Sequence, residues 1–237
     1  MIKIKNEELA KKIRESMIER YGTMINWHKN KPRGFSYCQF TADLKIGITR
    51  TDVISELNVI FPQTEFIEIY PQLTGSHPII FPSILTNELA EFLGYIIGDG
   101  HIRKHYIEIT NADTEIIERV VYLSKELFRL KTIVEKEKRS KCLYKMRISS
   151  KLLSEIIRNV FNIPLNKKSS IIRVPKQIMY ANEKIKTSFI QAYFDCDGFI
   201  ANNERSIEFC TASKKFAEDF RNLLLGIDIY STFSRKT

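Results

Sequence analysis

Two aspartates, Asp99 and Asp197, each follow an apolar stretch and directly precede a glycine. The stretches are NELAEFLGYII (87–97) and KIKTSFIQAYF (184–194), each long enough for a helix. Each carboxylate is therefore expected near a helix C-terminus, where it opposes the helix dipole and does not stabilise the helix. A pair of such carboxylates suits Mg²⁺ or Mn²⁺, and a metal held in this way suits attack on a phosphodiester. For either motif alone, the alternative is an Asp-Gly that simply ends a helix.

Small residues mark one face of each apolar stretch. They are Gly94 and Gly98 in the first, and Ala192 and Cys196 in the second. Small side chains allow two helices to pack backbone to backbone, which would bring both carboxylates to the foot of one interface. The glycine after each aspartate is expected to let the chain turn sharply at the helix end.

The two aspartates lie 98 residues apart, and each opens a similar unit. The predicted order is a strand (Tyr106–Asn111; Ser206–Thr211), an amphipathic helix (Asp113–Leu130; Ser213–Leu225) and a strand (Thr132–Lys138; Ile229–Arg235). The first copy continues with a strand, Leu143–Ser149, and a helix, Lys151–Phe161. A repeat of this length indicates an internal duplication with pseudo-two-fold symmetry. The second repeat is expected to be incomplete.

The repeats occupy the larger of two predicted domains. That domain is residues 83–237, with a first repeat at 86–163, a linker at 164–183 and a second repeat at 184–237. Residues 1–82 are expected to form a small, mostly helical domain. Within it, two short helices around Gly47, with Thr49 as the second N-cap, resemble a helix-turn-helix. A plain helical domain is the alternative. Three prolines in residues 71–85 predict a linker.

The net charge of +9 favours a polyanionic partner. Residues 1–85 carry 11 Lys and Arg against 9 Asp and Glu, whereas residues 86–237 carry 26 against 19, so the excess lies with the motifs. No apolar run reaches the ~18 residues that span a bilayer, and the N-terminus lacks an apolar signal segment. The four cysteines form no CxxC pair. A soluble, cytoplasmic protein with reduced thiols and no membrane partner is expected.

The segments FLGYIIGDG (92–100) and IQAYFDCDG (190–198) resemble the paired motifs of the LAGLIDADG (DOD-type) homing endonucleases, in their two-motif monomeric form. The resemblance covers about residues 84–237. It implies an α+β fold, a duplicated αββαββ core in which each half lays a curved antiparallel sheet along the major groove of double-stranded DNA. It also implies that Asp99 and Asp197 bind the metal. Asp195 is not the implied ligand, because Ile97 occupies the matching place in the first motif.

The resemblance implies further site residues. Asn111 would help to order the water network, Thr211 would be its weaker counterpart, and Lys151 would lie near the scissile phosphate. The alternative for Lys151 is a solvated residue in the first turn of a helix. Basic residues expected on the sheets are candidate DNA contacts, although each alone is typical of a protein surface: Arg103, Lys104, Lys136, Lys138, Arg139, Lys145 and Arg147.

The sequence thus predicts a site-specific, metal-dependent DNA endonuclease that acts as a pseudo-symmetric monomer. A catalytically inactive DNA-binding regulator or RNA-splicing maturase on the same scaffold is the main alternative. A structural module explains neither the paired motifs nor the charge. Residue 1 is Met and the sequence ends in SRKT, so an intein's splicing residues are not in view. A free-standing or intron-encoded protein, or part of a larger one, is therefore expected.

Overall fold

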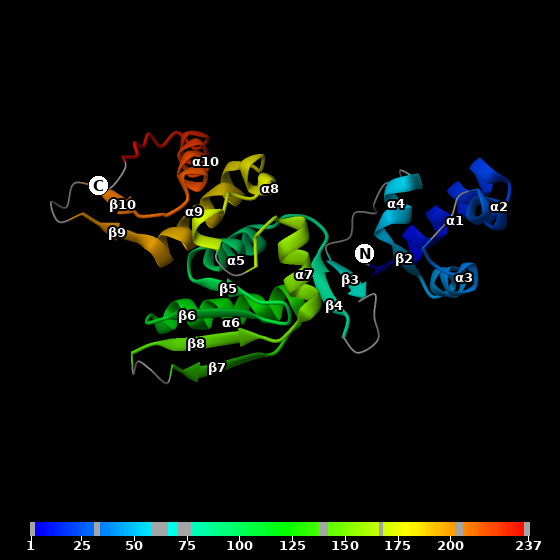
Figure 1. Ribbon diagram of the computed structural model, residues 1–237, viewed down its shortest axis with the longest axis horizontal. Helices are drawn as coiled ribbons and strands as arrows, with labels where there is room; N and C mark the ends of the chain where they lie inside the picture. Colours follow the sequence, from blue (N-terminus) through cyan, green and yellow to red (C-terminus); the bar gives the residue numbers. More distant parts are fainter. Residues whose placement is uncertain are drawn as a thin grey trace. The chain divides into compact units, whose positions relative to one another are not determined.

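The computed structural model describes residues 3–30, 34–57, 66–70, 77–137, 142–165, 168–201 and 206–234. The chain forms two compact units, Met1–Ile84 and Leu85–Thr237 (Figure 1). All strand pairings in both units are antiparallel among the residues described.

The N-terminal unit combines helices with a four-stranded sheet of order β2-β1-β3-β4. Its elements are β1 (Lys3–Lys5), α1 (Glu7–Tyr21), α2 (Met24–Lys29), α3 (Tyr37–Lys45), β2 (Ile48–Arg50), α4 (Thr51–Leu57), β3 (Phe66–Tyr70) and β4 (Ile79–Pro82). Helix α1 begins after Asn6, whose side chain accepts a hydrogen bond from the N–H of Leu9 at 2.8 Å. Leu9, Ile13 and Met17 form a fully buried stripe, as their helical spacing requires.

The predicted pair of helices around Gly47 is interrupted by a strand. Gly47 has a φ of 80°, and the chain then enters β2, in which Thr49 pairs with Ile4 of β1. The Thr49 hydroxyl donates to the Ile4 carbonyl oxygen at 3.3 Å, so its prediction as an N-cap is wrong. Helix α4 begins only at Thr51. The pairing partner lies 45 residues away in the sequence, beyond the reach of local patterns.

Part of the predicted linker also forms a strand. In the stretch 71–85, Ile79–Pro82 pairs with β3 from Ile69 to Phe66. This strand, β4, is at the edge of the sheet. An edge strand tolerates Pro82, because the N–H that proline lacks is not needed for a further strand.

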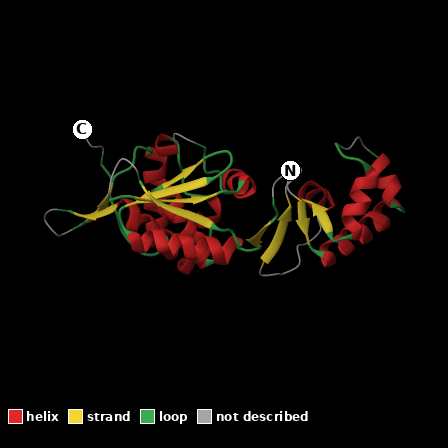
Figure 2. Cartoon of the chain, turned by 90° about the horizontal axis from the view of Figure 1, so that it is seen from below, coloured by secondary structure: helices red, strands yellow, loops and turns green. Residues whose placement is uncertain are grey.

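The first repeat of the C-terminal unit is a four-stranded sheet of order β5-β6-β8-β7 with helices against one face (Figure 2). Its elements are α5 (Asn87–Gly98), β5 (Gly100–Ile102), β6 (Ile107–Asn111), α6 (Thr114–Phe128), β7 (Thr132–Lys136), β8 (Tyr144–Ile148) and α7 (Lys151–Val160). Ile107 and Ile109 pair with Ile148 and Met146, and all four are fully buried. The alternating residues therefore lie on the opposite face of the sheet.

The second repeat copies the start of the first. After the 3-10 turn η1 (Lys168–Ser170) and α8 (Lys176–Met179) come α9 (Glu183–Asp197), β9 (Gly198–Ile200), β10 (Ile207–Phe209) and α10 (Lys214–Leu225). Gly198 pairs with Phe209 and Ile200 with Ile207, as Gly100 pairs with Ile109 and Ile102 with Ile107. The duplication therefore extends to the register of the strands.

The predicted strand Ile229–Arg235 is wrong over the part that the structure describes, since 229–234 is irregular. Its counterpart, β7, pairs with β8, and no strand follows α10 in the described residues of the second repeat. A strand needs a hydrogen-bonding partner. Over the part of the second repeat that the structure describes, the sheet thus contains β9 and β10 alone, and Ile200 and Ile207 are 68% and 72% exposed.

An aromatic core holds α9 against α10 in the second repeat. Tyr193 lies 4.8 Å from Phe216 and 5.1 Å from Phe220 between ring centroids. Arg173 adds a two-pronged ion pair to Asp219, with nitrogen–oxygen distances of 2.9 and 2.8 Å. This half therefore has its own core although its sheet is small.

Candidate active site and nucleic-acid interface

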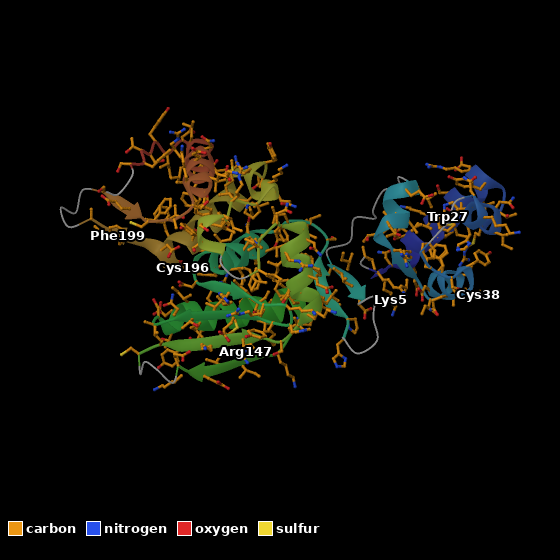
Figure 3. All side chains as sticks on the ribbon, viewed as in Figure 1. Lys5, Trp27, Cys38, Arg147, Cys196 and Phe199 are labelled. Carbon is orange, nitrogen blue, oxygen red and sulfur yellow. The ribbon has the colours of Figure 1, made fainter. Side chains whose placement is uncertain are left out.

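Helices α5 and α9 pack against each other through the predicted small residues. A Cβ atom on Gly94 would lie 2.7 Å from the Cβ of Ala192 and 2.7 Å from the carbonyl oxygen of Phe189. A Cβ on Gly98 would overlap the Cβ of Cys196 (Figure 3 labels Cys196 on α9). Such approaches are far shorter than carbon atoms accept. The prediction of backbone-to-backbone packing is confirmed.

The glycine after each aspartate has a steric role. A Cβ on Gly100 would lie 2.5 Å from the carbonyl oxygen of Ile96, and one on Gly198 would lie 2.6 Å from that of Phe194. Neither glycine has a positive φ. The chain passes directly from helix to strand at each glycine, as expected, and it does so without a left-handed backbone conformation. These glycines instead let each strand leave its helix along the preceding turn.

Asp99 caps the C-terminus of α5 and is held by Asn111. Its own N–H donates to the Tyr95 carbonyl oxygen at 3.0 Å. The Asn111 side-chain amide donates to Oδ2 of Asp99 at 2.6 Å, while its Oδ1 accepts from the N–H of Asp113 at 2.7 Å. Because Asp113 is the N-cap of α6, Asn111 links the carboxylate to that helix. The structure thus brings together Asp99 and Asn111.

Cys196 approaches Asp99 from the partner helix. Burial, reinforced by the neighbouring Asp99 carboxylate to which the thiol hydrogen-bonds, raises the pKa of Cys196 well above its usual value. The thiol therefore stays protonated and acts as a donor towards Asp99. Sequence reasoning treated Cys196 as a small packing residue and did not anticipate this contact.

Asp197 is the last residue of α9, and its environment differs from that of Asp99. Burial raises the pKa of Tyr193, and the nearby Asp197 carboxylate, with which it hydrogen-bonds, raises it further. Thr211 accepts a hydrogen bond from the N–H of Ser213 at 3.2 Å, as Asn111 does from Asp113. A threonine has no amide group to reach a second carboxylate. Asn111 and Thr211 therefore both accept a hydrogen bond at the start of the next helix, but only Asn111 also donates one to a motif aspartate.

Asp195 is engaged across the helix pair. The Tyr95 hydroxyl donates to its Oδ2 at 3.4 Å. Burial is the main reason that the pKa of Asp195 is raised, with Glu91 and Asp113 adding to the effect. The place of Asp195 in the other motif is taken by Ile97, so the mirror-image contact does not exist. Tyr95 and Tyr193 each precede a motif aspartate by four residues, a spacing that was visible in the sequence.

The carboxylates at the two helix ends suit a metal ion that takes most of its ligands from water and phosphate. No group of three or more His, Cys, Asp or Glu side chains in the described ranges can enclose an ion. Asp99 and Asp197 alone would supply two oxygens. Mg²⁺ is commonly held by one or two carboxylates, with water and phosphate oxygens completing its octahedron. The donor set therefore suits Mg²⁺ or Mn²⁺ bound together with a phosphate-containing partner.

Lys145 and Arg147 of β8 lie on the sheet face opposite the helices, in a network of ion pairs. Lys145 contacts Glu137 at 2.7 Å and Glu108 at 3.5 Å. Arg147, labelled in Figure 3, contacts Glu108 at 2.8 Å and lies 4.5 Å from the Tyr106 ring centroid. These cations are thus held in extended positions on the face by acidic neighbours. A polyanion that binds there must replace those carboxylates.

The other basic candidates lie around the rim of this sheet. Lys136, at the end of β7, lies 5.6 Å from the Tyr144 ring centroid. Arg103 and Lys104 occupy the turn between β5 and β6, where the Arg103 N–H donates to the Tyr106 carbonyl oxygen at 2.9 Å. Lys138 and Arg139 are outside the described residues.

Lys151 lies at the end of the sheet remote from Asp99. Strand β5 starts beside Asp99, and Lys104 follows it in the turn at the far end. Lys104 and Lys151 line the same pocket. The structure therefore does not bring Lys151 to Asp99. Its closest charged neighbour in the helix is Glu155, at 3.7 Å.

Removing the Asn111 side-chain amide is expected to destabilise the C-terminal unit. The Asn111→Leu change removes a donor to Asp99 and an acceptor for Asp113, so the free energy of unfolding should fall by about 1–3 kcal/mol. Thr211→Leu removes only the capping contact and should cost about 1 kcal/mol. Urea unfolding measures both. Equal losses would contradict the different roles assigned to the two residues.

A comparison with protein families identifies the fold of the C-terminal unit. The family model described as a LAGLIDADG-like domain matches residues 86–160 and 184–237, more than half of the chain. The chain belongs to the LAGLIDADG-like domain family. The two matched segments contain the two Asp-Gly motifs and leave out the whole of the predicted linker, 164–183.

This LAGLIDADG-like chain has curated relatives in archaea. One subunit of the A-type ATP synthase of Pyrococcus abyssi is 35% identical over 158 residues, which cover 67% of this chain and 15% of that protein. The replication factor C small subunit of Methanocaldococcus jannaschii is 33% identical over 202 residues, covering 82% of this chain and 10% of that protein. The LAGLIDADG-like chain thus spans only a small part of the length of these relatives.

Solved structures are also similar to this LAGLIDADG-like chain. A crystal structure of I-DmoI in complex with DNA and Mn is 20% identical, covers 62% of this chain and 80% of that one, and has a TM-score of 0.46. The N-terminal LAGLIDADG domain of DUF199/WhiA is 17% identical, covers 64% of this chain and 70% of that one, and has a TM-score of 0.42.

Every helix in the described ranges is too short or too polar to cross a membrane.

Proposed function

We propose that this chain is a site-specific endonuclease of double-stranded DNA that acts as a pseudo-symmetric monomer. The observation that carries the proposal is the close packing of α5 on α9, which unites two helices that both end in Asp-Gly. A structural protein does not need a carboxylate at the unfavourable end of each of two closely packed helices. Membership of the LAGLIDADG-like domain family supports the same function.

Asp99 and Asp197 would hold Mg²⁺ or Mn²⁺, with one carboxylate contributed by each repeat. When bound, such a metal activates water and neutralises charge on the phosphodiester that is cut. The protein positions the ligands: Asn111 and Cys196 fix Asp99, and Tyr193 hydrogen-bonds to Asp197. Asn111 and Thr211 remain candidates for ordering water beside the carboxylates. The location of Lys151 does not support a role for it beside the metal.

The sheet of the first repeat would lie in the major groove. The major groove admits a two-stranded antiparallel ribbon, and side chains that alternate along the strands reach base edges and phosphates. Lys145 and Arg147 are placed on the open face, and Arg103, Lys104 and Lys136 on its rim. Because Glu108 and Glu137 already pair with the strand cations, groove binding would exchange ion pairs and depend on salt.

The curated relatives support a function for the shared segment that differs from the activities for which those relatives are named. The names of the ATP synthase and replication factor C subunits describe unrelated activities, yet both proteins contain a segment similar to this chain. The similar segment covers 15% and 10% of these two proteins. We infer that this segment is a module carried within unrelated proteins, as a mobile genetic element would be.

One observation favours a second candidate, a DNA-binding regulator or RNA-splicing maturase that does not cleave. The described sheet of the second repeat has two strands against four in the first. Ile200 and Ile207 are largely exposed, whereas their counterparts Ile102 and Ile107 are 1% and 0% exposed. A two-stranded sheet offers less surface to the second half of a DNA site, which would weaken recognition there.

Incubation with a randomised duplex library, followed by sequencing of newly formed ends, tests the proposal. With Mg²⁺ or Mn²⁺ the protein should enrich one set of cut sequences, and chelation of the metal should abolish the enrichment. Salt-dependent retention of duplexes without new ends would favour the second candidate. A protein that neither retains nor cuts the duplexes would refute both candidates.

A further inference from the structure

A pocket at the remote end of the first sheet gathers positive charge from two separate elements. Lys104 comes from the turn between β5 and β6, whereas Lys151 and Arg158 come from α7. Ser154, Glu155 and Leu165 are the other described residues that line it. Lys151 and Arg158 are seven residues apart, so they lie on one side of the helix, two turns from each other. Sequence reasoning missed Arg158, because nothing local links it to Lys104.

The charges around this pocket do not cancel. Glu155, the one acidic residue in its lining, lies 3.7 Å from Lys151. Arg158 bonds through Nε to the neutral side chain of Asn159 at 3.1 Å, which does not reduce its charge. Among the described residues that line the pocket, three cations face one carboxylate, an excess of two positive charges.

The start of α7 adds to this positive potential. Ser150 caps the helix by accepting from the N–H of Leu153 at 3.1 Å, and the hydroxyl of the buried Ser154 donates to the Ser150 carbonyl oxygen at 3.0 Å. The first N–H groups of a helix have no partner within it and favour an anion. The first turn of this ten-residue helix is close to the pocket, because Lys151 is one of the residues that line it.

We propose that this pocket binds a backbone phosphate of the DNA duplex that lies against the first sheet. The proposal rests on the proposed DNA-binding function. Lys104 and Arg158 clasp the phosphate from two separate elements, and Lys151, at the start of α7, adds a third positive charge. A phosphate oxygen accepts charge-assisted hydrogen bonds from both kinds of cation, and the arginine fork adds direction.

The place of the pocket sets which phosphate it takes. From Asp99 the chain runs through the three residues of β5 and reaches Lys104 in the following turn, a span of about 15 Å at the rise of a strand. This distance corresponds to roughly four base pairs along the duplex axis. The pocket therefore anchors the flank of the site, outside the position of the cut. Such a contact fixes register and adds affinity without reading sequence.

The test compares two double variants that remove the same charge. Lys104→Gln/Arg158→Gln changes the pocket, and Lys125→Gln/Lys215→Gln changes two exposed lysines elsewhere in the C-terminal unit. Binding to a duplex is measured over a range of salt concentrations. Relative to the control, the pocket variant should bind about tenfold more weakly at low salt. The slope of log affinity against log salt should be smaller by about 0.9, the value for one phosphate.

Identical affinities and slopes for the two double variants would overturn the proposal while leaving DNA binding intact. If the unaltered protein binds no duplex, the proposed function fails first, and inorganic phosphate then tests the pocket. Phosphate that shifts the backbone amide resonances of Lys151–Ser154 in the unaltered protein, and not in the pocket variant, would uphold an anion site. The absence of such shifts would reject it. Circular dichroism confirms that each variant is folded.

Discussion

Replacing Asp99 or Asp197 with asparagine is expected to abolish metal-dependent cleavage while duplex binding persists. Asparagine keeps the shape of the side chain and loses the charge that the metal requires. A metal supplies several kcal/mol of transition-state stabilisation, so either variant should cut at least about 1000-fold more slowly. Binding should be equal or slightly tighter, because one negative charge near the DNA backbone has gone.

Two matched controls sharpen this expectation. Asp228→Asn makes the same change at an exposed position after α10, whose φ of 60° asparagine accepts, and should leave cleavage unchanged. Asp195→Asn retains an oxygen that can accept from the Tyr95 hydroxyl and should stay within about tenfold of the unaltered rate. If Asp195→Asn were as slow as Asp197→Asn, the choice between the neighbouring aspartates would be wrong. Cleavage by Asp99→Asn at the unaltered rate would remove that residue from the metal site.

Adding one methyl group to the α5–α9 interface is expected to cause the largest loss of stability. The Gly94→Ala change places a Cβ 2.7 Å from the Phe189 carbonyl oxygen, and backbone cannot rotate aside. Overpacking of this kind costs about 1–3 kcal/mol or more, which exceeds the roughly 1 kcal/mol that alanine gains over glycine within a helix. The free energy of unfolding from urea titration should therefore fall by about 2–3 kcal/mol.

A rescue experiment separates the two glycines. In Gly98→Ala the obstruction is a side chain, Cys196, so Cys196→Gly should restore part of the lost stability, with a coupling of about 1 kcal/mol or more. Ala192→Gly should rescue Gly94→Ala less well, because the Phe189 carbonyl oxygen remains. Gly34→Ala, where a Cβ would meet nothing within 4 Å, should be nearly neutral. Equal stability of all three single alanine variants would contradict the close packing.

The features that could be predicted from the sequence are those that repeat within it. The small residues at Gly94, Gly98, Ala192 and Cys196 are helically spaced, and both apolar stretches end in the same dipeptide. Their close packing follows directly. Only the family resemblance predicted a role for Asn111 near the motif aspartates. Local sequence patterns could not do so, because Asn111 lies 12 residues from Asp99, at the end of the second strand after it.

Contacts that depend on strand partners far along the chain could not be predicted. Thr49 was placed at a helix start because its pairing with Ile4 leaves no local pattern. The strands β5 and β9, each of three residues, are too short to show alternation. The resemblance implies a place for Lys151 near the scissile phosphate, and only the direction of β5 and β6 shows that Lys151 lies at the end of the sheet remote from Asp99.

The hydrogen bond from Tyr95 to Asp195 crosses the interface in one direction only, because the matching pair would be Tyr193 with Ile97. In a dimer of identical subunits, every contact across the two-fold axis occurs twice. The two copies lie in a single polypeptide, so that constraint does not apply, and each copy has residues that the other lacks. Because the two halves differ in this way, the proposed DNA site has no physical reason to be palindromic.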